Sequence, residues 1–181
     1  MITNEKTKWI IDPVHTQVQF KAKHLVIATV TGSFSEFEGG MNSSREDFTD
    51  ADVWFSANTA SLNTGTPDRD NHLRSADFFD SANYPTLSFK STEIRKSGNG
   101  NYKLAGNLTI RDTTRPLELD VEYGGTMKDP WGNIKAGFEM TGKLNRKDYG
   151  LNWNAITEAG GLIVSEEVKI LLNVELSRQK E

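Results

Sequence analysis

Residues 14–24 read Val-His-Thr-Gln-Val-Gln-Phe-Lys-Ala-Lys-His, and the stretch alternates between two kinds of side chain. Its even-numbered positions are mostly apolar, and its odd-numbered positions are polar or charged. Successive side chains of an extended chain point to opposite faces. The stretch is therefore predicted to be a β-strand with one face in the interior of the protein and the other in water.

The same alternation recurs along the rest of the chain. It is strong in residues 117–123, 136–146 and 168–176, and weaker in 29–38, 51–60, 86–94 and 102–110. Together with 14–24 these runs make about eight strands, separated by short clusters of Gly, Asn, Asp and Pro that are typical of turns. We expect an all-β protein, and specifically an extended eight-stranded antiparallel lipocalin-like barrel.

One segment, residues 66–79, departs from the strand pattern and is typical of a short helix. Thr66 is a suitable N-cap, and Pro67 is favourable at the first helical position. Asp70 and Arg74 have the i,i+4 spacing of an ion pair on one helix face. We expect this helix in the connection that follows the third strand.

Composition and charge limit the possible functions. The chain has 181 residues, which suits one domain, with a tail at 1–8 and a barrel at 9–177. The net charge of −4 gives no basic footprint for nucleic acid, and the absence of Cys excludes disulfides and thiolate chemistry. The first residues lack the apolar run of a secretory signal, so we expect a cytoplasmic protein, or a periplasmic one if a signal has been removed. No apolar stretch is long enough for stable membrane insertion.

Several short motifs occur in a consistent order. They are Asp12-Pro-Val-His-Thr16, Gly32-Ser-Phe34, Asn63-Thr-Gly65, His72-Leu-Arg74, Asp77-Phe-Phe79, Tyr84-Pro85, Gly106-Asn-Leu-Thr-Ile110, Asn145-Arg146 and Tyr149-Gly-Leu151. With them the chain resembles the YceI-like family of lipocalin-like, polyisoprenoid-binding proteins, from about Trp9 to Leu176. The resemblance implies a barrel that holds a long isoprenoid or related lipid. The family tends to Gly where this chain has Asp112, and we expect Asp112 to adopt the left-handed conformation there.

The apolar faces of the predicted strands supply candidates for the lining of a tunnel. They are Val18, Phe20, Ala22, Ala136, Phe138, Met140, Leu144, Ile170, Leu172 and Val174. From the sequence alone a filled, closed core is the favoured interpretation of these side chains, and it is the resemblance that favours a tunnel. The small inward residues Ala22, Gly106, Ala136 and Gly142 are expected to leave room in the bore.

Cationic residues are predicted to gather at one end of this bore. In an up-and-down meander all odd-numbered strands run the same way, so the first and seventh strands end at the same opening. The candidates for contact with a ligand head group are His24, Arg69, His72 and Arg146. Arginine binds phosphate through a planar set of donors. The alternative is structural: both arginines pair with Asp70, Asp77 or Asp148, and His24 is a core histidine.

Catalysis has little support in the sequence. No G-x-S-x-G, H-E-x-x-H or glycine-rich phosphate loop occurs, and His15 and His24 would project to opposite faces of one strand. We therefore expect no catalytic residue, no metal and no cofactor. The favoured function is binding of an isoprenoid chain, such as a polyprenyl phosphate or quinone, for transport, storage or sequestration. A fatty-acid or fatty-amide binder, and an enzyme acting on a lipid head group, stay open, as does a homodimer.

Overall fold

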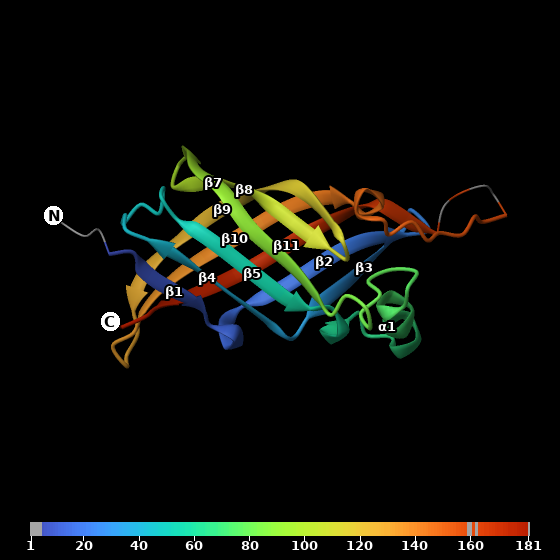
Figure 1. Cartoon of the computed structure of the whole chain (residues 1–181), viewed down its shortest axis with the longest axis horizontal. Coiled ribbons are helices and arrows are strands. Elements are labelled where there is room, and N and C mark those ends of the chain that lie inside the picture. The colour runs from blue at the N-terminus through green and yellow to red at the C-terminus, as the bar shows by residue number, and fades with distance from the viewer. Residues whose placement is uncertain (1–4, 159–160, 162, 181) are drawn as a thin grey trace.

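A computed structural model describes residues 5–158, 161 and 163–180. Figure 1 shows an elongated barrel with a short helix at one end. The strands are β1 (Thr7–Ile11), β2 (Gln17–His24), β3 (Ala28–Phe34), β4 (Phe37–Ser43), β5 (Asp52–Asn58), β6 (Leu62–Asn63), β7 (Thr86–Gly98), β8 (Asn101–Ile110), β9 (Thr113–Lys128), β10 (Ile134–Asn145) and β11 (Val164–Arg178). The helices are α1 (Pro67–Arg74) and the single 3₁₀ turns η1 (Pro13–His15), η2 (Thr59–Ser61) and η3 (Arg146–Tyr149).

The eleven strands form one closed barrel with eight strand positions around it, here called staves. β1 and β2 form the first stave, β3 and β4 the second, and β5 and β6 the third; β7 to β11 are uninterrupted. Each stave pairs antiparallel with its neighbour in sequence, and β11 closes the barrel by pairing with both β1 and β2. The prediction of an eight-stranded antiparallel barrel with a helix after its third strand is confirmed.

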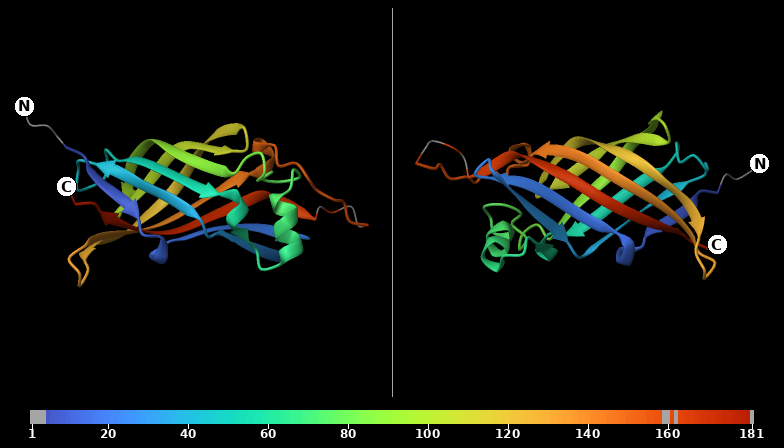
Figure 2. Two further views of the ribbon diagram at one scale, coloured as in Figure 1. Left: turned by 60° about the horizontal axis from the view of Figure 1, so that its bottom comes forward. Right: turned by 180° about the vertical axis from the view of Figure 1, so that it is seen from behind.

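The three interrupted staves break at the same level of the barrel. The backbone N–H of Ser35 donates to the carbonyl of Ser61 at 3.3 Å, and that of Asn58 donates to the carbonyl of Glu36 at 2.9 Å. The break in the first stave is tied to β11 by the N–H of Asp12, which donates to the carbonyl of Glu175. Figure 2 shows the resulting bend on one side of the barrel, while β7 to β11 sweep past unbroken.

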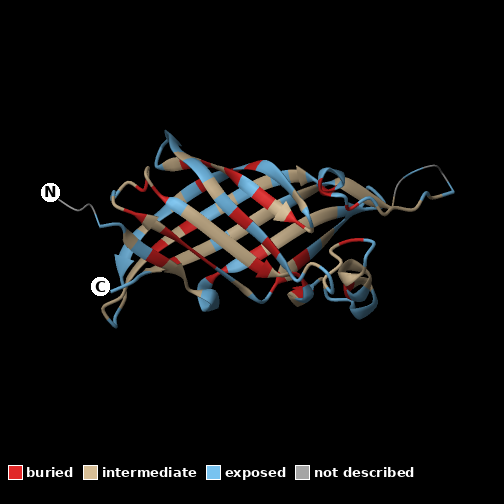
Figure 3. Ribbon diagram, viewed as in Figure 1, coloured by how far each residue is buried: buried red, intermediate tan, exposed pale blue. Residues whose placement is uncertain are grey.

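Burial alternates along the staves as the sequence pattern predicts. In β8 the side chains of Tyr102, Leu104, Leu108 and Ile110 are buried, while those between them are more exposed. Figure 3 shows the same banding across the neighbouring strands. The apolar face of every long strand therefore points into the barrel, and the core lies along its axis.

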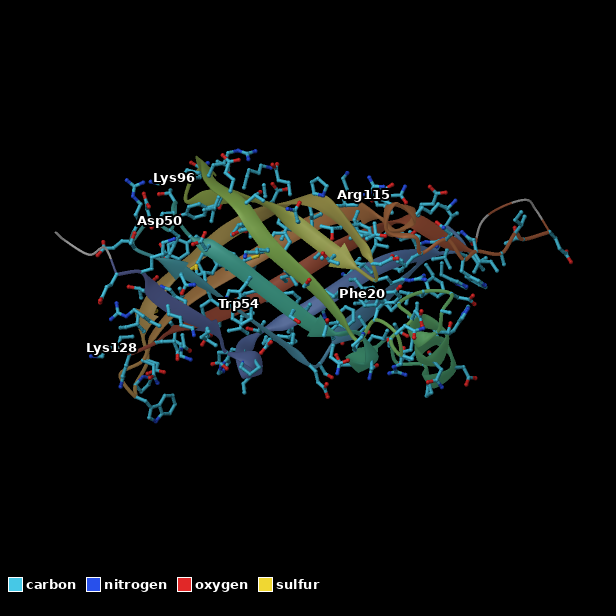
Figure 4. The ribbon with its side chains drawn as sticks, in the orientation of Figure 1. Phe20, Asp50, Trp54, Lys96, Arg115 and Lys128 are labelled. Atoms are coloured by element: carbon cyan, nitrogen blue, oxygen red, sulfur yellow. The ribbon has the colours of Figure 1, made fainter. Side chains whose placement is uncertain are left out.

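The end of the barrel opposite α1, here called the terminal end, is closed by an aromatic side chain. Phe48 lies in the loop between β4 and β5, and its ring centre is 5.8 Å from that of Trp9 and 5.6 Å from those of Tyr123 and Phe138. The loop is fastened to the wall by the Tyr102 hydroxyl, which donates to the carbonyl of the residue before Phe48. Figure 4 shows Asp50 of this loop and Lys96 at the same end.

The α1 end is covered by the segment that follows the third stave. Helix α1 is shorter than predicted, and the expected pair between Asp70 and Arg74 is wrong. Asp70 is buried and accepts a hydrogen bond from the N–H of Thr64 at 2.8 Å. Arg74 donates to the carbonyls of Ala60 and Leu62, both at 2.9 Å. Arg74 thus bonds carbonyl groups outside the helix in place of an ion pair on the helix surface, because such a pair contributes only ~0.2–0.5 kcal/mol.

The turn between β8 and β9 supports this covering segment. Arg111, and not Asp112, has the positive φ, at 56°, so the expectation for Asp112 is wrong. The Arg111 guanidinium donates to the carbonyls of Ala76 and Phe78 and lies 5.7 Å from the centre of the Tyr84 ring. The arginine in the turn therefore holds the chain that follows α1 against the barrel.

Candidate functional site

The barrel encloses an elongated apolar cavity of about 220 Å³. Its lining follows β11 from Val164 at the α1 end to Leu176 near the terminal end. Twelve residues of a strand at ~3.3 Å each, tilted by ~40°, correspond to roughly 30 Å along the barrel axis. The cavity is thus long and narrow, with Phe48 at one end and the α1 segment at the other.

Most of the residues predicted to line a tunnel do border this cavity. They are Val18, Phe20, Ala22, Phe138, Met140, Leu144, Ile170, Leu172 and Val174. Ala136 does not: it is fully buried in the wall, with Leu176 and Thr126 as its cross-strand partners. Several of the lining side chains are only half-buried, as expected for groups that face an unfilled space rather than a packed core.

Part of the lining was not predicted from the sequence. The covering segment contributes Leu73, Phe78 and Phe79, and the loop after η3 contributes Leu151. Three staves with weaker alternation and the strongly alternating run at 117–123 contribute a further set: Val53, Phe55, Leu87, Phe89, Leu104, Leu108, Ile110, Leu117, Leu119 and Val121. The alternation of apolar and polar residues in 51–60, 86–94, 102–110 and 117–123 could have identified these additional lining residues.

The inward glycines do not widen the bore as expected. A β-carbon at Gly142 would lie 2.5 Å from Cδ2 of Leu119, and one at Gly106 would collide with the ring of Phe89. Each glycine therefore makes room for a neighbouring side chain within the wall. Of the small inward residues in the prediction, only Ala22 borders the cavity.

Arg146 provides the one charged side chain among the described residues that line the cavity. It follows β10 as the first residue of η3, and it is only 3% exposed. Its Nε donates to the carbonyl of Ser165 at 2.8 Å, and its Nη1 donates to those of Leu151 at 2.6 Å and Trp153 at 2.8 Å. Its Nη2 donates to the carbonyl of Val164 at 3.3 Å. A guanidinium has five N–H donors, so these bonds leave one on Nη2.

The positive charge of Arg146 has no carboxylate within 4 Å in the described part of the chain, so the alternative in which it pairs with Asp70, Asp77 or Asp148 is wrong. Glu166, which lies close enough to affect it, is bound by Lys147 at 2.8 Å. Burial lowers the pKa of the guanidinium below its ordinary value. A buried cation bonded only to neutral carbonyls is costly, and a nearby anion would lower that cost.

His72 lies one layer away from Arg146. Its ring packs edge-on against Trp153 at 4.6 Å and Phe78 at 5.2 Å between ring centres, and its Nε2 is 2.8 Å from Oδ2 of Asp77. The Phe78 ring in turn lies 6.0 Å from the guanidinium carbon of Arg146. His72 therefore buttresses the aromatic side chains beside Arg146 and is not itself part of the cavity lining.

The other two predicted head-group residues lie at the same end of the barrel but away from the cavity. Arg69 donates to the Oγ1 and the carbonyl of Thr64, both at 2.7 Å, and thereby holds the loop before α1. His24 pairs with Val164 across β2 and β11, and its side chain is exposed, so it is not a core histidine. The order of the strands brings all four predicted head-group residues to one end of the barrel. Of the four, Arg146 is the one whose side chain borders the cavity.

A separate cluster of titratable groups lies outside the barrel wall at η1. Asp12, His15 and Glu175 place a ligand atom each within 4.8 Å of one another, which the sequence did not predict. Lys135 already supplies a cation there, with its Nζ 2.9 Å from Asp12 and 3.6 Å from Glu175. This arrangement is an ion-pair network that fastens η1 to β10 and β11.

Nothing in the described residues forms a helix with the length and apolar character to cross a membrane.

The sequence and the fold of this chain are both similar to those of known proteins. The family model for the YceI-like domain matches residues 9–176. A UPF0312 protein of Serratia proteamaculans is 37% identical over 166 residues, covering 92% of this chain and 83% of its own. The crystal structure of the Campylobacter jejuni YCEI protein aligns with a TM-score of 0.73 at 30% identity, over 88% of this chain and 90% of that one. A polyisoprenoid-binding domain from Saccharophagus degradans aligns with a TM-score of 0.66 at 15% identity, over 94% and 98%.

Proposed function

Because this chain belongs to the YceI-like family, we propose that it binds a long-chain lipid with an anionic or strongly polar head. The tail lies in the barrel cavity and the head lies at Arg146. The observation that carries the proposal is the combination of a long apolar cavity with the buried guanidinium of Arg146 at its α1 end, which has no carboxylate within 4 Å among the residues that the structure describes. We infer an isoprenoid tail, which agrees with the name of the Saccharophagus degradans domain of the same fold.

The cavity favours binding by burial of the tail. Each methylene removed from water contributes ~0.8 kcal/mol before ordering costs, so a chain that follows a space roughly 30 Å long gains most of its affinity from apolar contact. The head contributes less. A hydrogen bond to a charged partner is worth ~1.5–3 kcal/mol, or about ten- to a hundredfold in affinity. Arg146 therefore selects the head group, and the cavity sets the affinity.

The lining supports binding rather than catalysis. Among the described residues that border the cavity there is no carboxylate, imidazole, hydroxyl or thiol. Nucleophilic and general acid–base catalysis need such a group within hydrogen-bond reach of the reacting atoms. Arg146 can orient and neutralise an anionic head, and it has no neighbour in the lining that could abstract a proton from a bound ligand.

The proposal is tested by comparing two ligands that differ only in the head. Geranylgeranyl phosphate and geranylgeraniol share one tail, and both are titrated against the wild-type chain and Arg146→Gln. We expect the wild type to prefer the phosphate by about ten- to a hundredfold, and the variant to bind both alike. Equal losses for the two ligands in Arg146→Gln would show that Arg146 only supports the barrel.

Because Arg146→Gln removes bonds from four carbonyls, its fold is checked by thermal denaturation, and a second measurement uses the wild type alone. A tail-labelled photoactivatable analogue should cross-link to cavity residues such as Leu172 and Phe138. Labelling confined to the outer surface would refute the proposal without any variant. Native mass spectrometry of the purified chain then separates an isoprenoid from a fatty acid or fatty amide by the mass of the retained ligand.

A further inference from the structure

Two loops at the α1 end expose aliphatic side chains to water. The turn between β2 and β3 consists of Leu25, Val26 and Ile27, and the last two are 76% and 84% exposed. Ile156, in the loop between η3 and β11, is 75% exposed. We refer to these four residues as the apolar tip. In Figure 1 the loop before β11 projects beyond the barrel at the α1 end.

The two loops are fastened to each other through the backbone. The N–H of Leu25 donates to the carbonyl of Ile163 at 2.9 Å, and the N–H of Ile163 donates to the carbonyl of Ala155 at 3.1 Å. Ala155 directly precedes Ile156. The apolar tip is therefore one connected feature of the fold.

The backbone of the turn is unfavourable for the residues that occupy it. Leu25 has a φ of 51° and Val26 a φ of 67°. Val26 is the one β-branched residue with a positive φ among the described residues. Gly or Asn adopts this conformation far more readily. Neither the local conformation nor burial in the barrel explains a Val at this position, so the side chain is suited to a contact outside the molecule.

A group of lysines lies on the outer wall behind the tip. Lys21 of β2 is directly opposite Lys169 of β11, and Lys169 is directly opposite Lys143 of β10. Like charges in opposite positions destabilise a sheet. None of the three has a carboxylate within 4 Å in the part of the chain that the structure describes. We refer to Lys21, Lys169 and Lys143 as the lysine row.

The neighbourhood of the row is basic on balance. Lys23 lies one pleat closer to the tip and donates to the hydroxyl of Thr29. Lys147 is paired with Glu166. Glu167, opposite Asn145, is the carboxylate two residues before Lys169 on the outer face of β11. A protein with a net charge of −4 thus concentrates positive charge beside its apolar tip.

We propose that the α1 end docks on an anionic lipid bilayer, with the apolar tip inserted and the lysine row at the level of the head groups. Lys21 lies three positions before the end of β2 at His24, or roughly 8 Å along the barrel axis for a strand tilted by ~40°, and the apolar tip begins at the next residue. Interfacial elements insert their apolar face by ~5–10 Å, which leaves Lys21 among the phosphates. Anionic lipids attract basic residues at this distance.

The shape of the surface favours a bilayer over a protein partner. Four aliphatic side chains on two projecting loops form a narrow convex surface, whereas a standard protein interface takes about 800 Å² from each partner. The choice also rests on the proposed function, since a lipid bound in the cavity has a bilayer as its source. Docking itself does not require a bound lipid, so the two proposals are measured separately.

The tip is tested by co-flotation of the delipidated chain with vesicles of phosphatidylcholine and phosphatidylglycerol in equal amounts. Val26→Asn with Ile27→Ser should weaken vesicle binding at least tenfold, and Asn suits the positive φ at position 26, so the fold is kept. The matched control is Met127→Asn with Trp131→Ser, which alters side chains 76% and 82% exposed at the terminal end. The control variant should bind like the wild type.

The lysine row is tested with Lys21→Gln, Lys143→Gln and Lys169→Gln combined. Binding to the anionic vesicles should weaken about a hundredfold, which corresponds to ~1 kcal/mol for each lysine. The control combines Lys8→Gln, Lys90→Gln and Lys128→Gln, which removes the same charge from exposed positions elsewhere on the barrel. Vesicles of phosphatidylcholine alone should bind the wild type weakly.

The proposal is overturned if the tip variant binds the mixed vesicles like the wild type, or if the terminal-end variant loses binding in its place. It is also overturned if phosphatidylcholine alone binds equally well, or if sedimentation shows that the tip joins two copies of the chain in the absence of vesicles. Loading of geranylgeranyl phosphate from detergent is measured in parallel. Lost docking with unchanged loading is the expected result for both test variants, and failed loading with intact docking would refute only the proposed function.

Discussion

Cδ2 of Leu119 occupies the space above the α-carbon of Gly142, 2.5 Å from where a β-carbon of residue 142 would lie. Gly142 and Leu119 belong to the neighbouring staves β10 and β9. The missing side chain at Gly142 therefore makes room for the side chain of Leu119 within the wall, and it adds no volume to the cavity. A larger side chain at position 142 would disturb the wall before it reached the cavity.

We predict that Gly142→Ala lowers the free energy of unfolding by ~1–3 kcal/mol, the usual cost of overpacking a core. In a Leu119→Ala background the same substitution should cost much less, because the displaced atoms are gone. Urea denaturation of the four proteins measures this coupling. Gly137→Ala is the matched control in the same strand, since nothing lies within 4 Å of a β-carbon there. Additive effects of Gly142→Ala and Leu119→Ala would contradict the steric interpretation.

The hydrogen bonds of Arg146 predict a large structural effect alongside its effect on the ligand. Arg146→Met should lower the free energy of unfolding by about 3–5 kcal/mol, because the buried carbonyl of Leu151 and the part-buried carbonyls of Trp153 and Ser165 lose a charged donor. Arg69→Met removes bonds to Thr64 alone and should cost ~1–2 kcal/mol. Chemical denaturation of both variants checks the order. A cost for Arg146→Met no greater than for Arg69→Met would show that its bonds are weak.

Removal of the Phe48 ring, which closes the terminal end, should change both the stability of the fold and the length of the lipids that bind. Phe48→Ala deletes ring contacts with Trp9, Tyr123 and Phe138 and should cost ~3–5 kcal/mol. It also lengthens the cavity, so the variant should gain affinity for longer isoprenoid phosphates relative to the wild type. Phe37→Ala, which removes a half-buried ring stacked on Phe55, is the control for loss of an aromatic side chain. Unchanged chain-length preference in Phe48→Ala would mean that the tail does not reach this end.

The network at η1 predicts a loss of stability toward both acid and base. The hydrogen bond from His15, followed by that from Lys135, lowers the pKa of Asp12 to about 2. This stabilisation is complete above the unfolded value of ~3.9 and disappears as the pH falls toward 2. The hydrogen bond to Asp12 raises the pKa of His15. That contribution is complete below ~6.5 and disappears as the pH rises through the higher folded value.

The free energy of unfolding should therefore decline on both sides of a range from about pH 4 to 6.5. His15→Gln should flatten the decline on the alkaline side, while much of the acid decline stays because Lys135 still bonds Asp12. Asp12→Asn should remove the acid decline and reduce the alkaline one, which Glu175 beside His15 still supports. Urea titrations between pH 2 and 9 record the three curves. An alkaline decline in His15→Gln that matches the wild type would assign it to another group.

Much of the barrel was predictable because a period of two settles both the type of element and the face it buries. Val18, Phe20 and Ala22 share parity in the sequence and share the cavity in the structure. The meander then follows from short turns, and it brings His24 and Arg146 to opposite sides of Val164 at one end. These inferences need only local chemistry and the rule that neighbouring strands pair.

The finer features depended on partners remote in sequence. A 3₁₀ turn that begins at Pro13 takes up the first two residues of the strand predicted at 14–24. The strand before it, β1, begins at Thr7 in the segment expected to be a tail. Whether Gly142 opens space depends on Leu119, and whether Arg146 meets a carboxylate depends on the loop after η3. Parity places a side chain on a face, but it does not say what lies across from it.

The shared break in the first three staves gives the barrel two mechanically different sides. β7 to β11 cross the whole length without interruption, whereas the breaks near Asp12, Ser35 and Thr59 replace continuous ladder bonds with a few turn bonds. The side formed by β7 to β11 is expected to be rigid, and the side formed by the three interrupted staves is expected to bend at its breaks. If the barrel binds lipids of different width, the cavity can therefore change its diameter at the interrupted side while the hydrogen bonds among β7 to β11 stay intact.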